Sequence, residues 1–276
     1  MKTLHEAISA MENKGGAGAS LQKHLAAVGI SAWKHITRAG LYDFRDHLGE
    51  AVAPSTAKTL AAYLKSLLGR YCDQLNLPSD WRKILSVKAA KPMKTYLNED
   101  DLAKMEAAPV HTFRQQFVKN VFLICAFTGL RVSDAMDLTP ENVDGGVIRY
   151  RAQKTGKAGL VPLKTGLEER IAWVSEHQGS RVTLAGYNRA LRDMARRAGI
   201  CECVVVVKGG KEQKGEKWQF ISSHTARIST ASNLNRRGVP IGDIMSILQH
   251  SSVAMTERYV IRDKVDLSPA AMAYFS

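Results

Sequence analysis

The sequence has no long apolar run and few cysteines, and these two features limit the classes of protein to which it can belong. No segment reaches the ~18 continuous apolar residues of a membrane-spanning helix, so we expect no membrane partner. The first residues include acids and no apolar core, unlike a secretory signal. Among the four cysteines, Cys201 and Cys203 are too close to bridge comfortably, and no second metal-ligand pair accompanies them. A reducing compartment, the bacterial cytosol, fits this pattern best.

Acidic residues are also scarce relative to basic ones, and this imbalance indicates a kind of partner. The 276 residues include 39 Lys and Arg against 26 Asp and Glu, a net charge of +13. Divided at residue 94, the first part has 14 basic and 7 acidic residues and the second has 25 and 19, so both parts are basic. This favours a polyanionic partner such as nucleic acid, although charge alone does not distinguish it from an anionic membrane or from a merely soluble basic protein.

Residues 1–88 have the pattern of a helical domain. Apolar residues recur at helical spacing through residues 31–50, which predicts a helix there. Pro54, followed by Ser and Thr, marks the start of another helix that continues to about residue 75. Residues 89–97 contain Lys and Pro but no acid, which predicts a basic linker. Fully extended, such a linker spans about 30 Å, more than the ~12 Å width of a DNA major groove.

Residues 98–276 combine helices with a few strands. Asn98 precedes three acids and is expected to cap a helix, and a longer buried helix is expected to end at Gly129. From Ser222 onward the pattern is helical again. The strand-like segments are residues 147–153, 159–163 and 203–207. The expected fold class is therefore mainly α with a small antiparallel β-sheet, in a helical domain (1–88), a linker (89–97) and a mixed α/β domain with a C-terminal tail (98–276).

Residues that can carry chemistry gather in this second domain. His224 and Arg227 are three apart just after a Ser-Ser helix start, so they share one helix face. His250 follows a second helix, and Tyr259 lies nine residues later on a third helix that Ser252 is expected to cap. Taken singly, these residues are more often structural, because tyrosines are commonly half-buried and histidines commonly satisfied polar groups.

Three further residues lie upstream of these. Arg131 follows Gly129, Asp134 lies one helical turn beyond it, and Lys154 lies at the tip of a predicted hairpin. By default an Arg–Asp pair is a surface ion pair worth ~0–1 kcal/mol, and a lysine-rich turn is solvated. The co-occurrence of all these residues in one order indicates a shared function.

The chain resembles the tyrosine recombinase, or phage integrase, family in the order of six residues: Arg131, Lys154, His224, Arg227, His250 and Tyr259. The segments TGLRVSD, QKTGK and LQHSSVAMTERYV are close to the family pattern, and the similarity covers about residues 96–262. It implies an N-terminal helical, SAM-like core-binding domain and a mixed α/β catalytic domain. The sequence departs from the pattern at Gln249, where the family often has Gly, and at Ile228, where it often has His.

The resemblance also implies how protons and bonds move. Tyr259 would attack a DNA phosphodiester, leaving a 3′-phosphotyrosine and a free 5′-hydroxyl. Because a phenol is largely protonated at neutral pH, His224 would act as the general base that accepts its proton. Lys154 would protonate the leaving 5′-oxygen, a role that suits an amine. The covalent intermediate keeps the energy of the phosphodiester, so religation needs no ATP.

The resemblance assigns the remaining residues to charge stabilisation. Arg131 and Arg227 would meet the charge that develops on the phosphate with planar guanidinium groups, and His250 would add a hydrogen bond. Asp134 would orient Arg131. This set implies no metal and no other cofactor, and the sequence contains no GxxxxGK[ST] phosphate-binding loop.

The function implied is site-specific recombination in the integration, excision or resolution of a mobile element or replicon. Its partner would be double-stranded DNA with inverted half-sites, bound by a homotetramer that is a monomer when free in solution, and the protein would be phage- or element-encoded. One alternative is a non-catalytic DNA-binding regulator on the same fold, which predicts DNA binding without a covalent adduct. Another is a type IB-like topoisomerase, which predicts relaxation of DNA by a monomer with little sequence preference.

Some segments have two interpretations each. The basic segment 208–217 is predicted as a long hairpin tip that either touches the DNA backbone or stays solvated. The tail after Tyr259 has an apolar end, which either docks on a neighbouring protomer or folds back on its own domain. Residues 1–29 are too short for the arm-binding domain that phage integrases often carry, so we expect either binding at core sites alone or a further part outside this chain.

Overall fold

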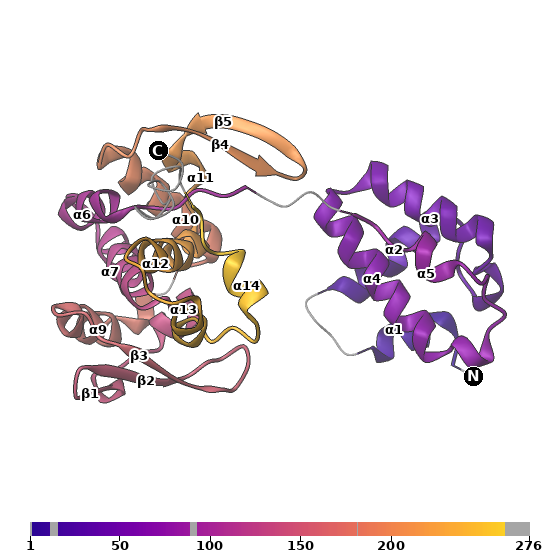
Figure 1. Ribbon diagram of the computed structural model, residues 1–276, viewed down its shortest axis with the longest axis horizontal. Coiled ribbons are helices and arrows are strands. Elements are labelled where there is room, and N and C mark those ends of the chain that lie inside the picture. Colours follow the sequence, from indigo (N-terminus) through magenta and orange to yellow (C-terminus); the bar gives the residue numbers. More distant parts are fainter. Residues whose placement is uncertain (1, 12–15, 89–92, 181, 263–276) are drawn as a thin grey trace, which may run out of the picture. The chain divides into compact units, whose positions relative to one another are not determined.

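The structure is a computed structural model that describes residues 2–11, 16–88, 93–180 and 182–262 (Figure 1). The chain divides into two compact units: Met1–Met93 with Val207–Gln213, and Lys94–Val206 with Lys214–Ser276. The division between Met93 and Lys94 falls inside the predicted linker, of which residues 89–92 lie outside the described ones. Among the described residues, no helix is both long enough and apolar enough to cross a membrane.

The first unit consists mainly of helices that pack around one apolar core. They are α1 (Leu4–Ala10), α2 (Ala17–Ala27), α3 (Arg38–Ala51), α4 (Pro54–Arg70) and α5 (Trp81–Ile84), with 3-10 turns η1 (Trp33–His35) and η2 (Cys72–Gln74). Phe44 from α3 and Leu64 from α4 are fully buried in this core. Helix α4 begins at Pro54 as predicted, because proline is tolerated in the first helical turn, where its missing N–H has no partner to lose. Its predicted end near residue 75 is wrong, because α4 ends at Arg70 and η2 follows as a separate turn.

The prediction of one helix over residues 31–50 is wrong. Residues 33–35 form the separate turn η1, and α3 begins only at Arg38. The break occurs at Thr37, whose backbone is extended and whose hydroxyl accepts a hydrogen bond from the Gly40 N–H at 3.1 Å. A threonine in this geometry caps a new helix and stops the preceding one from continuing.

The second unit is built around α7 (Phe113–Thr128), which contacts α9, α10 and α12 (Figure 1). Residues from Phe117 to Ala126 are buried, so nearly every face of the helix is covered, including its two polar residues Lys119 and Asn120. It ends, as predicted, at Gly129, which has a left-handed φ of 73°. The surrounding helices are α6 (Glu99–Ala107), α8 (Val132–Met136), α9 (Leu167–Glu176), α10 (Leu184–Arg197), α11 (Lys217–Phe220), α12 (Ser223–Arg236), α13 (Ile241–Ile247) and α14 (Val253–Glu257), with 3-10 turns η3 (Pro140–Asn142) and η4 (Gln178–Ser180).

The chain also forms two small sheets, of which the second has its tip, Val207–Gln213, assigned to the first unit. Strands β1 (Val143–Asp144), β2 (Val147–Arg151) and β3 (Ala158–Pro162) form an antiparallel sheet in which Ile148 pairs with Val161. Strands β4 (Cys203–Lys208) and β5 (Lys211–Glu216) form a second sheet. The predicted fold class, mainly α with a small antiparallel sheet, is confirmed.

The prediction of a long hairpin tip over residues 208–217 is wrong. Most of this segment is strand β5, and only Gly209 and Gly210 form the turn between β4 and β5. Both glycines have left-handed φ angles, 62° and 80°. A two-residue turn of this kind matches the twist of the strands it joins, so a Gly-Gly pair closes the hairpin tightly.

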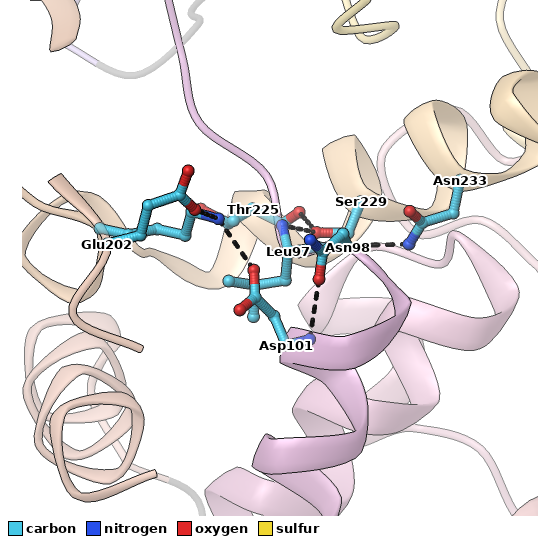
Figure 2. Close-up of polar contacts among 8 residues, drawn as sticks. Leu97, Asn98, Asp101, Glu202, Thr225, Ser229 and Asn233 are labelled. Carbon is cyan, nitrogen blue, oxygen red and sulfur yellow. Dashed lines mark hydrogen bonds and ion pairs between the residues drawn. The ribbon is translucent and has the colours of Figure 1, made fainter. Parts of the chain in front are cut away.

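The chain segment before α6 is anchored on α12, the helix that carries His224 and Arg227 (Figure 2). The Leu97 N–H donates to Ser229 Oγ at 2.9 Å, and the Leu97 carbonyl accepts from Asn233 Nδ2 at 3.0 Å. Both backbone polar groups of one residue are therefore satisfied by side chains one helical turn apart. This contact places the end of the predicted linker directly on the helix that positions the candidate site.

Two further contacts hold the start of α6. Asn98 caps the helix as predicted, with its side chain accepting from the Asp101 N–H at 2.8 Å. The Asp101 carboxylate pairs with the buried Lys217 ammonium at 2.9 Å, and Lys217 also pairs with Glu202 (Figure 2). Removing Lys217 would leave the Asp101 carboxylate buried without its cation, so this ion pair favours the observed position of α6.

Candidate active site

Tyr259 lies in a turn just beyond α14 and not on that helix, so its predicted helical position is wrong. Ser252 caps α14 as predicted, but the helix ends at Glu257. The Tyr259 N–H bonds to the Thr256 carbonyl at 2.8 Å, which tightens the last turn. The Tyr259 carbonyl accepts from Ser232 Oγ of α12 at 3.3 Å. The turn is thus held from α12, and the phenol ring is brought over that helix.

Three of the predicted residues surround the Tyr259 ring. The centroid of the His224 ring lies 5.0 Å from that of Tyr259 in an edge-on arrangement, and the His250 centroid lies at 4.7 Å. The central carbon of the Arg227 guanidinium lies 5.9 Å from the Tyr259 centroid. Residues from the start of α12, from the end of α13 and from the turn after α14 therefore meet at one phenol.

Arg227 is buried, with 2% of its surface exposed. Its two terminal nitrogens donate to the carbonyls of Gly129 and Leu248, which end α7 and α13. Its Nε is buried and has no hydrogen-bond partner in the part of the chain that the structure describes. Burial, and then the nearby charge of Arg131, lower the pKa of Arg227. The residue thus joins three helices and still presents one unsatisfied donor.

Arg131 immediately precedes α8, and Asp134 lies one turn further along the chain, as predicted. Arg131 Nη1 is 3.8 Å from Asp134 Oδ2, and the Asp134 side chain is only 1% exposed. The other carboxylate oxygen of Asp134 accepts from the Gln153 N–H at 3.0 Å. Asp134 therefore contacts both the guanidinium and the base of the β2–β3 turn that carries Lys154.

Lys154 is exposed in the turn between β2 and β3, at the predicted hairpin tip. Its charge acts on His224, whose pKa falls to about 4. The largest cause is the partial removal of water from the imidazole, and the charges of Lys94, Arg227, Arg131 and Lys154 follow in that order. His224 is exposed as a whole residue, but its imidazole is held in the neutral form at neutral pH, as a proton acceptor must be.

His250 is more enclosed, with 8% of its surface exposed. Burial, and then the charges of Arg227 and Arg131, lower its pKa to about 4. Its Nδ1 lies 3.1 Å from the hydroxyl of the fully buried Thr256. The Thr256 hydroxyl has a second acceptor, the Ser252 carbonyl at 3.4 Å. A neutral imidazole donates from one nitrogen only, so Nε2 carries the donor hydrogen when the Thr256 hydroxyl donates to the nearer Nδ1.

Sequence reasoning missed two members of this site. The Lys94 ammonium lies 5.4 Å from the centroid of the Tyr259 ring, yet in the sequence Lys94 is only one of several linker lysines. Thr256 contacts His250, and its position three residues before Tyr259 was the only available signal. Within the described ranges, no group of three or more His, Cys, Asp and Glu side chains is placed to hold a metal ion.

Sequence comparison agrees with this arrangement. The model of the phage integrase family matches residues 95–265, more than half of the chain. The chain belongs to the phage integrase family. The predicted family is thus confirmed. The match includes all six residues of the predicted site, and Lys94 lies one residue before it.

Individual relatives of this family member share less than a third of its residues. Tyrosine recombinase XerD of Neisseria meningitidis is 27% identical over 216 residues, covering 74% of this chain and 71% of that protein. A protein of Pseudomonas phage Pf1 named as an integrase is 28% identical over 192 residues, covering 69% of this chain. The chain spans 50% of the length of that phage protein.

Solved structures extend the likeness of this phage integrase family member to nearly the whole chain. The Tn1549 transposon integrase in complex with a circular intermediate DNA has a TM-score of 0.71 at 14% identity, covering 99% of this chain and 100% of that one. A lambda integrase dimer bound to a core site has a TM-score of 0.65 at 13% identity, covering 97% of this chain and 81% of that one. At these identities, the likeness shows a shared fold.

Proposed function

We propose that this chain is a site-specific DNA recombinase that cleaves and rejoins DNA through a covalent bond to Tyr259. One observation carries the proposal: the Arg227 guanidinium lies beside the Tyr259 phenol, and its Nε is a buried donor without a hydrogen-bond partner among the described residues. A buried donor left unsatisfied costs ~1–3 kcal/mol, which an arriving phosphate oxygen would offset. Cationic donors prepared for an anion next to a nucleophile support phosphoryl transfer.

In the proposed reaction, each residue of the site has a separate role. Tyr259 Oη forms a bond to the DNA phosphorus as the bond from phosphorus to the 5′-oxygen breaks. His224, neutral at neutral pH, accepts the phenol proton, and Lys154 gives a proton to the leaving 5′-oxygen. Arg131 and Arg227 stabilise the extra negative charge on the phosphate oxygens in between. Religation reverses these steps.

The two remaining residues, His250 and Asp134, have supporting roles. His250 would donate to a phosphate oxygen from Nε2, with Thr256 holding Nδ1. Asp134 would orient Arg131 and, through Gln153, hold the turn that carries Lys154.

The partner and assembly follow from the same proposal. The Tn1549 and lambda integrases in the structures cited above are bound to DNA, and both chain parts are basic here. We expect double-stranded DNA with inverted half-sites, a homotetramer on DNA formed from monomers, and action in the bacterial cytosol. The tail expected to regulate such assembly lies mostly in residues 263–276, outside the described residues.

A covalent-adduct assay tests the proposed function. A binding site is first selected from random DNA, and a nicked suicide substrate carrying it is incubated with the protein. We expect a protein–DNA adduct on a denaturing gel, and none from Tyr259→Phe despite unchanged binding. Tyr71→Phe, which alters a half-buried tyrosine of the first unit, is the matched control and should form adducts normally.

The alternatives give different results in the same assay. A non-catalytic regulator would bind the site without any adduct from the unaltered protein. A topoisomerase would form adducts and relax supercoiled DNA as a monomer without a preferred site. Adducts formed by Tyr259→Phe would show that another residue is the nucleophile.

A further inference from the structure

Lys94 is a lysine of the predicted linker that lies inside the candidate active site. Its ammonium is 5.4 Å from the centroid of the Tyr259 ring, within the range of a cation–π contact. The side chain is half-buried, and burial lowers the pKa of its amine. A solvated linker lysine would show neither feature.

The position of Lys94 is fixed by the contacts that follow it in the chain. Three residues later, both backbone groups of Leu97 bind side chains of α12, at Ser229 and Asn233 (Figure 2). Ser229 is fully buried and its hydroxyl also donates to the Thr225 carbonyl at 2.8 Å, so its orientation is set. The linker end is thus tied to the helix that carries His224.

The Lys94 charge is directed at the site and not at a carboxylate. Across the described parts of the chain, no Asp or Glu forms an ion pair with Lys94. Among the cations that lower the pKa of His224, Lys94 has the largest effect. The ammonium lies over the Tyr259 ring, and its charge acts on the His224 imidazole, on which the charges of Arg227, Arg131 and Lys154 act as well.

We propose that Lys94 is a further active-site residue whose ammonium stabilises the phenolate form of Tyr259 during attack on DNA. This inference rests on the proposed function. Ionisation moves electron density into the phenol ring, so a cation over the ring is attracted more strongly to the phenolate than to the phenol. Lys94 keeps its proton throughout, and the phenol proton still goes to His224.

The contribution is needed because His224 is a weak proton acceptor in the free protein. The same cations that keep the imidazole neutral also weaken its hold on an additional proton. Transfer of the phenol proton during attack is therefore assisted by the positive charges around the ring. Lys94 contributes to this positive charge and is not one of the six residues of the family pattern.

The test is the pH profile of adduct formation in single turnover at saturating DNA. Lys94→Met removes the charge and keeps an unbranched side chain, whereas Lys94→Arg keeps the charge. We expect Lys94→Met to be roughly tenfold slower at pH ~7, with its rising limb about one pH unit higher and a rate near that of the unaltered protein at high pH. Lys94→Arg should restore most of the rate, and Lys104→Met, which removes an exposed lysine of α6, should change neither rate nor profile.

Each other outcome overturns the inference. Lys94→Met with the rate and profile of the unaltered protein would show that the charge is not used. A loss that is equal at every pH and is not restored by Lys94→Arg would show a structural role only, and thermal unfolding checks that each variant is folded. If the unaltered protein forms no adduct, the proposed function fails first, and the inference falls with it.

Discussion

Gln249 shows how a single residue departs from the family pattern at a structural cost. In the described part of the chain it is the one residue other than glycine with a positive φ, 49°. A side chain in this left-handed region costs ~1–2 kcal/mol, which explains why glycine is common at the position. Its side-chain amide is also buried without a hydrogen-bond partner among the described residues. The other departure, Ile228, is simply buried, with 3% of its surface exposed.

We therefore predict that Gln249→Gly stabilises the protein. The relief of left-handed strain exceeds the ~0.5–1 kcal/mol that glycine loses through its greater freedom in the unfolded chain, so the free energy of unfolding should rise by ~1 kcal/mol. Urea denaturation measures it. Gly159→Ala is a useful partner, because the added carbon would collide with the Gln249 side chain and with Tyr150. Gly159→Ala should therefore destabilise the protein less when residue 249 is also changed to glycine. A loss of stability on Gln249→Gly alone would contradict the strain assigned to Gln249.

The two histidines of the site predict a pH dependence of stability. The pKa of each falls from 6.5 to about 4 on folding, so between these values the unfolded chain binds more protons than the folded one. Stability from this source is complete above pH 6.5 and is lost as the pH falls toward about 4. Denaturation at several pH values should show a smaller slope in this window for the His224→Gln/His250→Gln variant. An equal slope would mean that neither imidazole is perturbed.

At the scale of elements, the β2–β3 hairpin depends on Asp134. This carboxylate links the start of α8 to the Gln153 N–H at the base of the turn with Lys154. We predict that Asp134→Ala slows DNA cleavage roughly tenfold, because the turn loses its buried anchor. A substrate with a 5′-thiol leaving group, which needs no proton, should recover most of that loss.

The control for this prediction is Asp134→Asn, whose remaining carbonyl oxygen can still accept from Gln153. It should retain more activity than Asp134→Ala on ordinary DNA. If the thiol substrate gives no recovery, Asp134 acts through Arg131 alone and not through the hairpin.

Local caps made several elements predictable from the sequence. Asn98, Gly129 and Ser252 each set a helix boundary through their own side chain or φ angle, and these boundaries are where the sequence indicated. The break at Thr37 and the end of α14 were not predicted. The turn after α14 is held by Ser232, 27 residues earlier in the chain, which no local pattern reveals.

The same distinction applies to the site. The shared face of His224 and Arg227 follows from their spacing on one helix, whereas the meeting of Arg227 with Gly129 and Leu248 depends on how α7, α12 and α13 pack. Lys94 could not be predicted, because its place over the phenol depends on the hydrogen bonds of Leu97.

At the scale of the whole molecule, the chain has two compact units, and all the candidate catalytic residues lie in the second. Each of the two parts divided at residue 94 is basic on its own. We therefore expect the second unit to carry out DNA cleavage and both units to bind DNA. Domain boundaries, tetramer formation and the role of the tail remain predictions.

The central claim is that DNA becomes joined to one particular phenol. The covalent complex formed on the suicide substrate can be digested with a protease and a nuclease, and the peptide that retains a nucleotide identified by mass spectrometry. The account predicts a 3′-linked nucleotide on the peptide that contains Tyr259 and on no other. A nucleotide attached to any other residue, or to the 5′ end of the cleaved strand, would contradict it.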